Sequence, residues 1–562
     1  MAGIAYALIA RALALSGLGL VVLFAYNLYR ARMRVRSIST KYGLPLLPHS
    51  FILGHLIISA KVAMKWPADV STSLIPYLIS LEYPEYSKHG YFYLDMWPIV
   101  NSMIVVSNPD MMVSFTQDVS LPKHRQMPFE FGPFSHGLDL VTSNGPVWKT
   151  WRAIFNPAFS LKNIQTYVPI MLQEYNIFRS KLAKLATDGD IVNMDKVTMA
   201  LTVDIIGHAV LGARLDAQTT DCELFKLLKE QISLLFVDYS PGSLRKLFMP
   251  TRAYRMWRNE RAMRRIVQPY IEKGIRDHGS KQGNKTMLRY NSLAVTNYLK
   301  EYSALEGSID EAWIHIAIQQ FKMLLFAGHD TVSSTFYFVT ALLHNNPASL
   351  AKCREELNTV FGPYDPKSNN PDTIDPAQSL IASNPEILNQ LPYLNACIKE
   401  TLRLFGPVSG SVRENPNPNT NHFLYHPDHP QTPIPVWDFM LFAHQAQSHR
   451  DPAYFADPHS FVPDRWLAKP GEKWYPGHKY AYRPFEHGPR NCIGQEFAML
   501  EMRLVLALVL REWELEPVLP QEKTYLGSNL YQSTPTEEIT MHPRGGMPMR
   551  VRRREQLVKS LH

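Results

Sequence analysis

The chain begins with an apolar stretch that is long enough to cross a membrane. Residues 4–29 are almost wholly apolar, and four arginines follow within residues 30–36. A helix of about 20 apolar residues spans the hydrocarbon core of a bilayer. Positive charge on the C-terminal flank of such a helix places that flank in the cytosol. The pattern therefore predicts a transmembrane anchor over residues 1–36, followed by a cytosolic body.

A cleaved signal peptide is the alternative interpretation of this stretch. Little positive charge precedes the apolar run, the run is long, and no small-residue cleavage site follows it, so a retained anchor is favoured. The segment Tyr42–Pro48 contains prolines that cannot continue a helix, which predicts a stiff hinge over residues 37–54. The cytosolic topology also predicts that the glycosylation sequon at residues 284–286 stays unmodified.

After residue 55 the hydrophobic pattern is mostly helical. Short strand-like runs occur at residues 91–94, at residues 103–106 and within the last forty residues. Polar insertions interrupt the pattern at residues 278–291, 362–389 and 415–435. The last insertion is rich in proline and predicts a loop or a loose hairpin. No insertion requires a domain break, so we expect one mainly helical catalytic domain over residues 55–562 with a small β lobe.

One helical pattern stands out for its length. Residues 308–311 form a capping box, and helix-compatible residues continue to about residue 344, which predicts a rod of about 50 Å. The pattern is apolar nearly all round between residues 313 and 326, so the helix should be buried. Asp330 and Thr331 lie in its middle and need polar partners there. Either Thr331 bonds back to the carbonyl four residues earlier in a packed helix, or both residues serve a function.

Composition and charge exclude several classes of protein. Hydrophobic residues make up 46% of the 562 residues, enough for a large core. Much of the +8 net charge lies in two short tracts, at residues 30–36 and 550–554, with no basic stripe interleaved with aromatic residues between them. This argues against nucleic-acid binding and suits a membrane surface or an acidic partner. Four cysteines without a CxxC pair argue against a disulfide framework and a four-cysteine zinc site.

Cys492 lies in a loop with a distinctive pattern. The ten residues 485–494 contain Gly488 and Gly494, which permit a tight turn around the cysteine. A long helical pattern follows over residues 494–513, so Cys492 should lie just before a helix N-terminus. The unpaired N–H groups and the dipole of that terminus stabilise a thiolate, which is the form that binds iron. A lone cysteine is more often a small buried apolar residue, but the surrounding loop pattern favours a metal ligand here.

Two further pairs of residues have helical spacing. Glu400 and Arg403 lie three residues apart, as in an ordinary ion pair on a helix, and Arg465 could join them. Trp148 and Arg152 lie one turn apart, which suits contact with an anionic group from one side.

These motifs resemble those of the cytochrome P450 superfamily and occur in the family's order. The resemblance implies that Cys492 is the axial ligand of haem b. It implies contacts with the haem propionates for Trp148, Arg152, Arg413 and Arg490, with Phe485 as a further cofactor-binding residue. Asp330 and Thr331 would be the catalytic residues that handle protons and water beside the bound dioxygen. Glu400, Arg403 and Arg465 would form a structural ion network.

The resemblance also implies a function. We expect an α-rich, prism-like fold around a haem held between the long helix and the Cys492 loop. Electrons would come from NADPH through a cytochrome P450 reductase, with cytochrome b5 as a further donor, at the endoplasmic reticulum membrane. Residues 143–159 and 483–495 are similar to fungal members, many of which oxidise polyketides or terpenoids. The expected reaction is oxygen insertion into an apolar small molecule, with epoxidation and desaturation as alternatives.

Two other classes of haem protein remain open. A haem-thiolate isomerase or dehydratase needs neither a reductase nor external O₂, but it can also dispense with the acid–alcohol pair that Asp330 and Thr331 provide. A haem carrier or sensor would need no proton delivery at all. By family geometry, the substrate-facing positions would be residues 129–136, Phe326 and residues 408–410, although aromatic residues there suit a core equally well.

Overall fold

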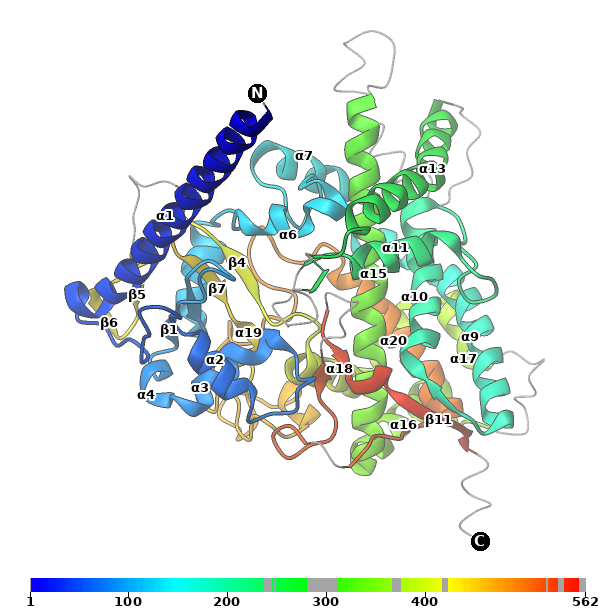
Figure 1. Ribbon diagram of the computed structural model, residues 1–562. Coiled ribbons are helices and arrows are strands. Elements are labelled where there is room, and N and C mark those ends of the chain that lie inside the picture. The colour runs from blue at the N-terminus through cyan, green and yellow to red at the C-terminus, as the bar shows by residue number, and fades with distance from the viewer. Residues whose placement is uncertain are drawn as a thin grey trace. The chain divides into compact units, whose positions relative to one another are not determined.

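The protein forms two compact units that are interleaved in sequence (Figure 1). The computed structural model describes residues 2–236, 245–246, 248–279, 311–365, 375–416, 423–521, 524–533 and 540–554. Unit 1 comprises Met1–Ala68, Leu74–His124 and Gly410–Gln447, and unit 2 comprises Asp69–Ser73, Arg125–Ser409 and Ser448–His562. Residues 55–562, for which the sequence predicted one domain, therefore contribute to both units. The sequon at residues 284–286 and the predicted cap residues 308–310 lie outside the described residues.

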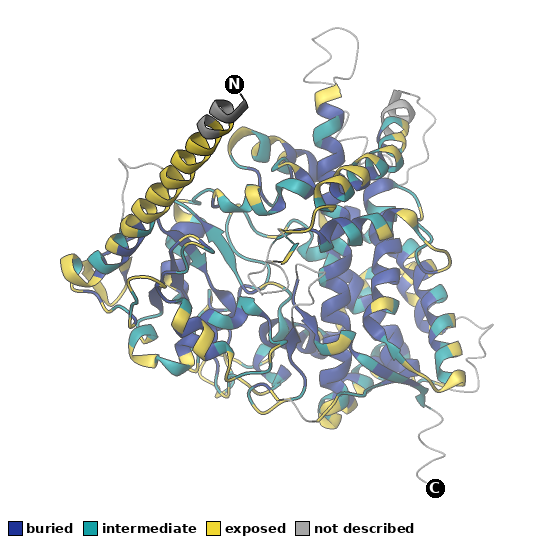
Figure 2. Ribbon diagram, in the orientation of Figure 1, coloured by how far each residue is buried: buried dark blue, intermediate teal, exposed yellow. Residues whose placement is uncertain are grey.

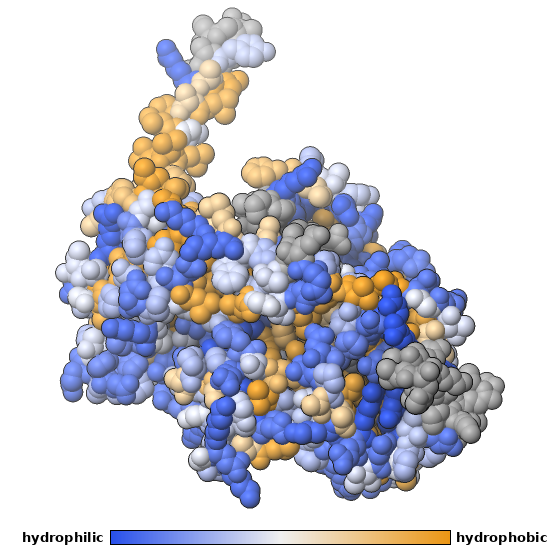
Figure 3. Space-filling view, turned by 90° about the horizontal axis from the view of Figure 1, so that it is seen from below, coloured by the Kyte–Doolittle hydropathy of each residue, from blue (hydrophilic) through white to orange (hydrophobic). Residues whose placement is uncertain are grey.

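The N-terminal helix α1 (Ala2–Tyr42) continues beyond the predicted anchor. Within the described residues, Ile9–Tyr42 is the one helix long and apolar enough to cross a membrane, by length and composition. Its first half is exposed (Figure 2), and apolar side chains cover it in Figure 3. The helix ends at Gly43, which adopts φ +65°. Residues 37–42 of the hinge predicted over residues 37–54 are helical and belong to α1, and the hinge itself stays a prediction.

The arginines after the apolar stretch are part of unit 1. Arg32 is fully buried, and its guanidinium lies 2.7 Å from the carboxylate of Asp95 and donates to the carbonyls of Ile52 and Trp97. Burial raises the pKa of Asp95, but hydrogen bonds from His49 and the charge of Arg32 outweigh it and leave the pKa below its usual value. Arg32 thus serves as a structural contact of α1 in addition to lying in the basic flank.

A four-stranded sheet forms the centre of unit 1. β2 (Met103–Val106) pairs antiparallel with β1 (Tyr91–Leu94) and parallel with β7 (Met440–Ala443), which also pairs antiparallel with β4 (Ser411–Arg413). β1 and β2 are buried along their whole length, in keeping with their continuous apolar runs. Both strands have the bounds that the sequence predicted.

The remaining elements of unit 1 are short. Its helices are α2 (Leu56–Ala63), α3 (Ile75–Glu82), α4 (Pro84–Ser87) and α5 (Pro109–Val113). β5 (Phe423–His426) and β6 (His429–Pro435) form an antiparallel hairpin. The hairpin confirms the prediction for residues 415–435, of which residues 417–422 lie outside the described part. α19 (Gln445–Ser448) lies where the chain passes from unit 1 to unit 2.

Unit 2 is mainly helical. Its helices are α6 (Gln126–Ser135), α7 (Gly145–Phe155), α8 (Leu161–Ile164), α9 (Val168–Asp188), α10 (Met194–Leu211), α11 (Glu223–Ser233), α13 (Arg252–Gly279), α15 (Glu311–Asn345), α16 (Pro347–Phe361), α17 (Pro376–Ser383), α18 (Pro392–Phe405) and α20 (Gln495–Glu512). The strand order β3 (Ile191–Asn193), β11 (Pro548–Arg553), β8 (Trp513–Pro517) forms one sheet, and β9 (Gln532–Ser533) pairs with β10 (His542–Pro543). The insertion predicted at residues 362–389 thus contains α17.

Helix α15 is the long buried helix that the sequence predicted. It runs for 35 residues and is buried along most of its length (Figure 2). It packs against α10, α13 and α18. Gly328 permits the close approach of α10, because a Cβ atom there would lie 2.5 Å from Cγ1 of Ile206. The glycine in the middle of this helix is therefore explained by packing.

A buried ion network joins α18 to the segment after it. One carboxylate oxygen of Glu400 lies 2.7 Å from Arg403 and 3.0 Å from Arg465, and the indole of Trp466 donates to the other. Arg403 also donates to the carbonyls of His449, Pro458 and Ser460. All three charged side chains are fully buried, so each depends on the others for a partner. This is the structural network expected from the sequence.

Loss of the central carboxylate should destabilise unit 2. We expect Glu400→Ala to lower the free energy of unfolding by about 3–5 kcal/mol, because two guanidiniums stay buried without their partner. Asp221→Ala removes a carboxylate from an exposed pair with Lys226 and should cost less than about 1 kcal/mol. Denaturant unfolding followed by circular dichroism measures both. A Glu400→Ala variant as stable as Asp221→Ala would contradict a structural role.

The position of an N-terminal truncation should decide stability. Deletion of residues 2–28 removes most of the apolar stretch and keeps the ion pair between Arg32 and Asp95. Deletion of residues 2–36 removes Arg32 as well and should cost about 3–5 kcal/mol more, because Asp95 loses the cation beside it. Both variants should be found largely in the soluble fraction instead of the membrane fraction. Only the longer deletion should unfold at a lower denaturant concentration than the full-length chain. Equal stability of the two would show that the pair contributes nothing.

Candidate functional site

The loop around Cys492 closes on itself before α20. The backbone N–H of Cys492 donates to the carbonyl of Phe485 at 2.8 Å, and Gly488 adopts φ +82° within the turn. Gly494 is the N-cap of α20, so Cys492 lies two residues before that cap. The loop thus presents a single thiol at the start of a long buried helix, as the sequence predicted.

Several groups act on the Cys492 sulfur. Protein atoms around it raise the pKa of the thiol, while the N–H groups of Gly494 and Gln495 and the charge of Arg152 lower it. The balance leaves the pKa above its ordinary value. A coordinated metal cation deprotonates a thiol outright, so iron at this sulfur would outweigh the effect of burial on its pKa.

Helix α7 brings two predicted cofactor-binding residues to this loop. The guanidinium of Arg490 stacks 4.4 Å from the centre of the Trp148 ring. Arg152 donates to the backbone carbonyl and to the side-chain oxygen of Asn491, both at 2.8 Å. Two guanidiniums and an indole therefore converge beside the cysteine, a donor set that fits the carboxylates of a haem, while the thiol fits its iron.

The other two predicted cofactor-binding residues, Phe485 and Arg413, do not belong to α7. Phe485 is partly buried and packs against the core of unit 2, within the Cys492 loop. Arg413 is fully buried in β4 of unit 1, where it pairs with Leu441 across the sheet. Its contact with a haem propionate stays a prediction from the family resemblance.

Thr331 and Asp330 of α15 have separate partners. The hydroxyl of Thr331 donates to the carbonyl of Ala327 at 2.8 Å, which is the back-bonding considered from the sequence. Asp330 lies 3.1 Å from Nε2 of His542 and accepts a hydrogen bond from Thr540. The carboxylate of Asp330 is buried and faces residues from the C-terminal part of the chain, and the expected role of both residues in handling protons stays a prediction.

The surroundings of Asp330 keep it ionised. Burial raises its pKa, but the charge and hydrogen bond of His542 and the hydroxyl of Thr540 outweigh burial and leave the pKa below its ordinary value. Sequence analysis did not single out Thr540 or His542. Their spacing of two residues, which places side chains on one face of an extended segment, was the available signal.

The predicted substrate-facing residues are brought together only in part. Phe134 and Phe326 are buried, and their ring centres lie 6.0 Å apart in an edge-on arrangement. Phe129 is 76% exposed, and Val408 is exposed as well. Of the predicted set, Phe134 and Phe326 are therefore the pair that forms an apolar contact.

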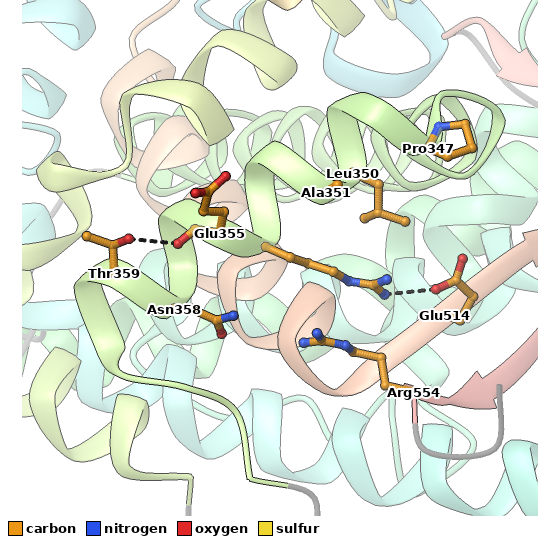
Figure 4. A pocket seen from close by; sticks show the side chains of 9 residues that line it. Pro347, Leu350, Ala351, Glu355, Asn358, Thr359, Glu514 and Arg554 are labelled. Carbon is orange, nitrogen blue, oxygen red and sulfur yellow. Dashed lines mark hydrogen bonds and ion pairs between the residues drawn. The ribbon is translucent and has the colours of Figure 1, made fainter. Parts of the chain in front are cut away.

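A surface hollow of about 740 Å³ lies elsewhere in unit 2. It is formed by α16 together with Glu514 and Arg554 (Figure 4). Arg354 of α16 also lines it and donates a hydrogen bond to Glu514. The hollow contains none of the predicted site residues. Among the described residues, no group of three or more His, Cys, Asp or Glu side chains could hold a metal ion. Cys492 therefore stays the centre of the candidate site.

Comparison with known proteins identifies the family of the chain. The family model described as cytochrome P450 matches residues 85–541. The cytochrome P450 monooxygenase polC of Polytolypa hystricis is 31% identical over 500 residues, which cover 88% of this chain and 85% of that protein. The cytochrome P450 monooxygenase acrF of Aspergillus aculeatus is 30% identical, with 84% of this chain and 95% of that protein covered.

Solved structures share the fold. The crystal structure of the cytochrome P450DA heme domain matches with a TM-score of 0.67 at 21% identity, covering 91% of this chain and 96% of that one. This likeness confirms the predicted fold class, mainly α with a small β part. The family match covers both the thiol loop and the long helix, and the chain therefore belongs to the cytochrome P450 family of haem-thiolate monooxygenases.

Proposed function

We propose that this chain is a membrane-anchored monooxygenase that takes electrons from NADPH through a reductase and oxidises an apolar small molecule. The observation that carries the proposal is the convergence of Cys492, Arg152, Arg490 and Trp148 at the start of α20. This arrangement combines one ligand for iron with donors for two carboxylates. The Asp330–Thr331 pair lies in α15, in a second motif that resembles those of the family. Its presence favours oxygen activation over simple transport of haem.

Each part of the site has a role in holding the cofactor. Cys492 would bind the iron, while Arg152, Arg490 and Trp148 would hold the propionates, joined by Arg413 and Phe485 as the family resemblance implies. Bound in this way, haem supplies O₂ activation, helped by the electron density of the thiolate. The helix terminus and Arg152 stabilise the negative charge of the sulfur.

Thr331 and Asp330 would deliver protons to the bound oxygen. The hydroxyl of Thr331 uses its own proton on Ala327, so its oxygen is left to accept a hydrogen bond and to fix a water molecule. Asp330, held as a carboxylate, can take a proton and pass it on towards that water.

The membrane and partner assignments rest on charge and length. Residues 1–36 would anchor the chain in the endoplasmic reticulum membrane by a single span, with residues 37–54 connecting it to a cytosolic body of residues 55–562. The helix Ile9–Tyr42 supports this by length and composition. The net charge of +8 suits an acidic reductase, and cytochrome b5 would be a second donor of the same kind.

The substrate would be an apolar fungal metabolite such as a polyketide or a terpenoid, altered by hydroxylation, epoxidation or desaturation. Support comes from similarity to two fungal proteins whose names include monooxygenase and from the apolar pair Phe134 and Phe326. An isomerase or dehydratase is the second hypothesis. This second hypothesis predicts that product forms without NADPH. The monooxygenase hypothesis predicts that one NADPH and one O₂ are consumed for each molecule of product.

Replacement of Cys492 should remove the thiolate signature. The carbon monoxide adduct of the reduced protein should show the red-shifted Soret band of thiolate ligation, and Cys492→Ser should lose it. Cys222→Ser, Cys353→Ser and Cys397→Ser are matched controls that should keep the band. Equal loss of the band in any control would contradict the ligand assignment.

Replacement of Thr331 should separate electron use from product formation. Without the ordered water, Thr331→Ala should still consume NADPH but release most of the reduced oxygen as hydrogen peroxide, with product per NADPH lowered about tenfold. Thr331→Ser keeps the hydroxyl and should recover most of the product. Peroxide and product are measured per NADPH consumed. Unchanged ratios in Thr331→Ala would mean that the hydroxyl serves only its bond to Ala327.

A further inference from the structure

The basic tract near the C-terminus is neutralised only in part by the elements beside it. Arg550 and Arg552 of β11 both pair with Glu516 of β8, at 3.4 and 2.9 Å. Arg553 has a carboxylate partner at the end of α20. Arg554 follows β11 directly and donates to a backbone carbonyl of α20, but no carboxylate of the described residues pairs with it. One guanidinium of the tract is therefore left without a counter-charge.

Arg554 lines the hollow of about 740 Å³ along α16. In Figure 4 its guanidinium points across the hollow towards Asn358. The amide oxygen of Asn358 is buried, and none of the described residues gives it a hydrogen bond. The amide group can present either this oxygen or its NH₂ group to a ligand, because it carries both an acceptor and donors. A cation and an amide thus lie at the same end of the hollow.

The other charged groups of the hollow have partners or point elsewhere. Arg354 donates at 2.8 Å to Glu514, which also lies 3.3 Å from His344. The carboxylate of Glu355 points away from Arg554 in Figure 4. Burial lowers the pKa of Arg554, and the charge of Arg354 lowers it further. The hollow can therefore accept one added negative charge, at Arg554.

The opposite end of the hollow is apolar. Helix α16 supplies the floor through two adjacent rows of residues spaced four apart, which lie on one face of the helix. The floor residues from the start of the helix are apolar: Pro347, Leu350 and Ala351. The later ones, up to Thr359, are charged or polar. At 1.5 Å per residue the floor is about 18 Å long. This polarity fits a ligand with an apolar chain at one end and a charged head at the other.

We propose that the hollow along α16 binds a long-chain carboxylate, with its chain on Leu350 and Ala351 and its carboxylate at Arg554. A planar guanidinium can donate two parallel hydrogen bonds to a carboxylate, and one unpaired guanidinium matches one negative charge. Burial of the chain against the floor supplies further affinity. None of the residues that line the hollow belongs to the Cys492 site, so this binding is independent of the proposed function.

Photolabelling of the full-length holoenzyme in nanodiscs of neutral phospholipid tests the site. The probe is palmitate that carries a diazirine at the end of its chain, and mass spectrometry assigns the labelled residues. We expect labels on α16 between residues 347 and 354. Unlabelled palmitate should displace the probe there, whereas hexadecanol, which lacks the charge, should not. A parent protein labelled elsewhere, such as beside Phe326, but not on α16 would overturn the proposal.

The charge at Arg554 is tested against another arginine of the same tract. Arg554→Gln should lower the labelling of α16 about tenfold, because a hydrogen bond to a charged group is lost. Arg550→Gln is the matched control, since Arg550 does not line the hollow and pairs with Glu516 instead. It should be labelled like the parent. Equal labelling of α16 in the two variants would overturn the assignment of Arg554.

A second pair of variants tests the floor without altering any charge. Ala351 is exposed in the hollow, so Ala351→Trp should fill the space of the chain and abolish the labelling of α16. Ala348→Trp places the same side chain at an exposed position of α16 that does not line the hollow, and it should keep the label. Circular dichroism should show that both variants fold like the parent. Undiminished labelling of α16 in Ala351→Trp would contradict binding in the hollow.

Discussion

A helix buried on nearly every side must find a protein partner for each polar side chain that it carries, and α15 imposes this requirement on unit 2. Three of its polar contacts are Lys322 with Glu260 of α13, Ser333 with Thr198 of α10, and Asp330 with His542 of β10. Each contact ties a different element to the same rod. The helix therefore organises its neighbours by polar satisfaction as well as by apolar packing.

The same requirement separates the two neighbouring residues of the family signature. Successive residues on a helix point about 100° apart, so Asp330 and Thr331 meet different surroundings. Thr331 is satisfied by its own helix through Ala327, whereas Asp330 depends on residues from the C-terminal part of the chain. The charge of Asp330 is consequently stabilised by a segment that lies far from it in sequence.

Local patterns explain what the sequence could predict. The strands at Tyr91–Leu94 and Met103–Val106 are compact apolar runs, and α20 follows the Cys492 loop with an unbroken helical pattern. Local patterns could not predict the partners of buried charges. Thr540 follows Asp330 by 210 residues, and no periodicity connects the two positions. Arg32 belongs to the same class. It lies in a basic tract that suggests a solvated flank. Only the fold shows that Arg32 is buried and forms an ion pair with Asp95.

Helix α1 is continuous from its apolar half to the ion pair between Arg32 and Asp95, and this continuity has a mechanical consequence. A chain joined to its anchor by a flexible tether can turn freely above the bilayer, but the last turns of α1 are packed into unit 1 through Arg32, Val35 and Ile38. Rotation of unit 1 about the apolar half of α1 would require a buried ion pair to open, at a cost of about 3–5 kcal/mol. The tilt that the apolar half of the helix adopts in lipid would thus be transmitted rigidly, and it would set which face of unit 1 looks towards the membrane.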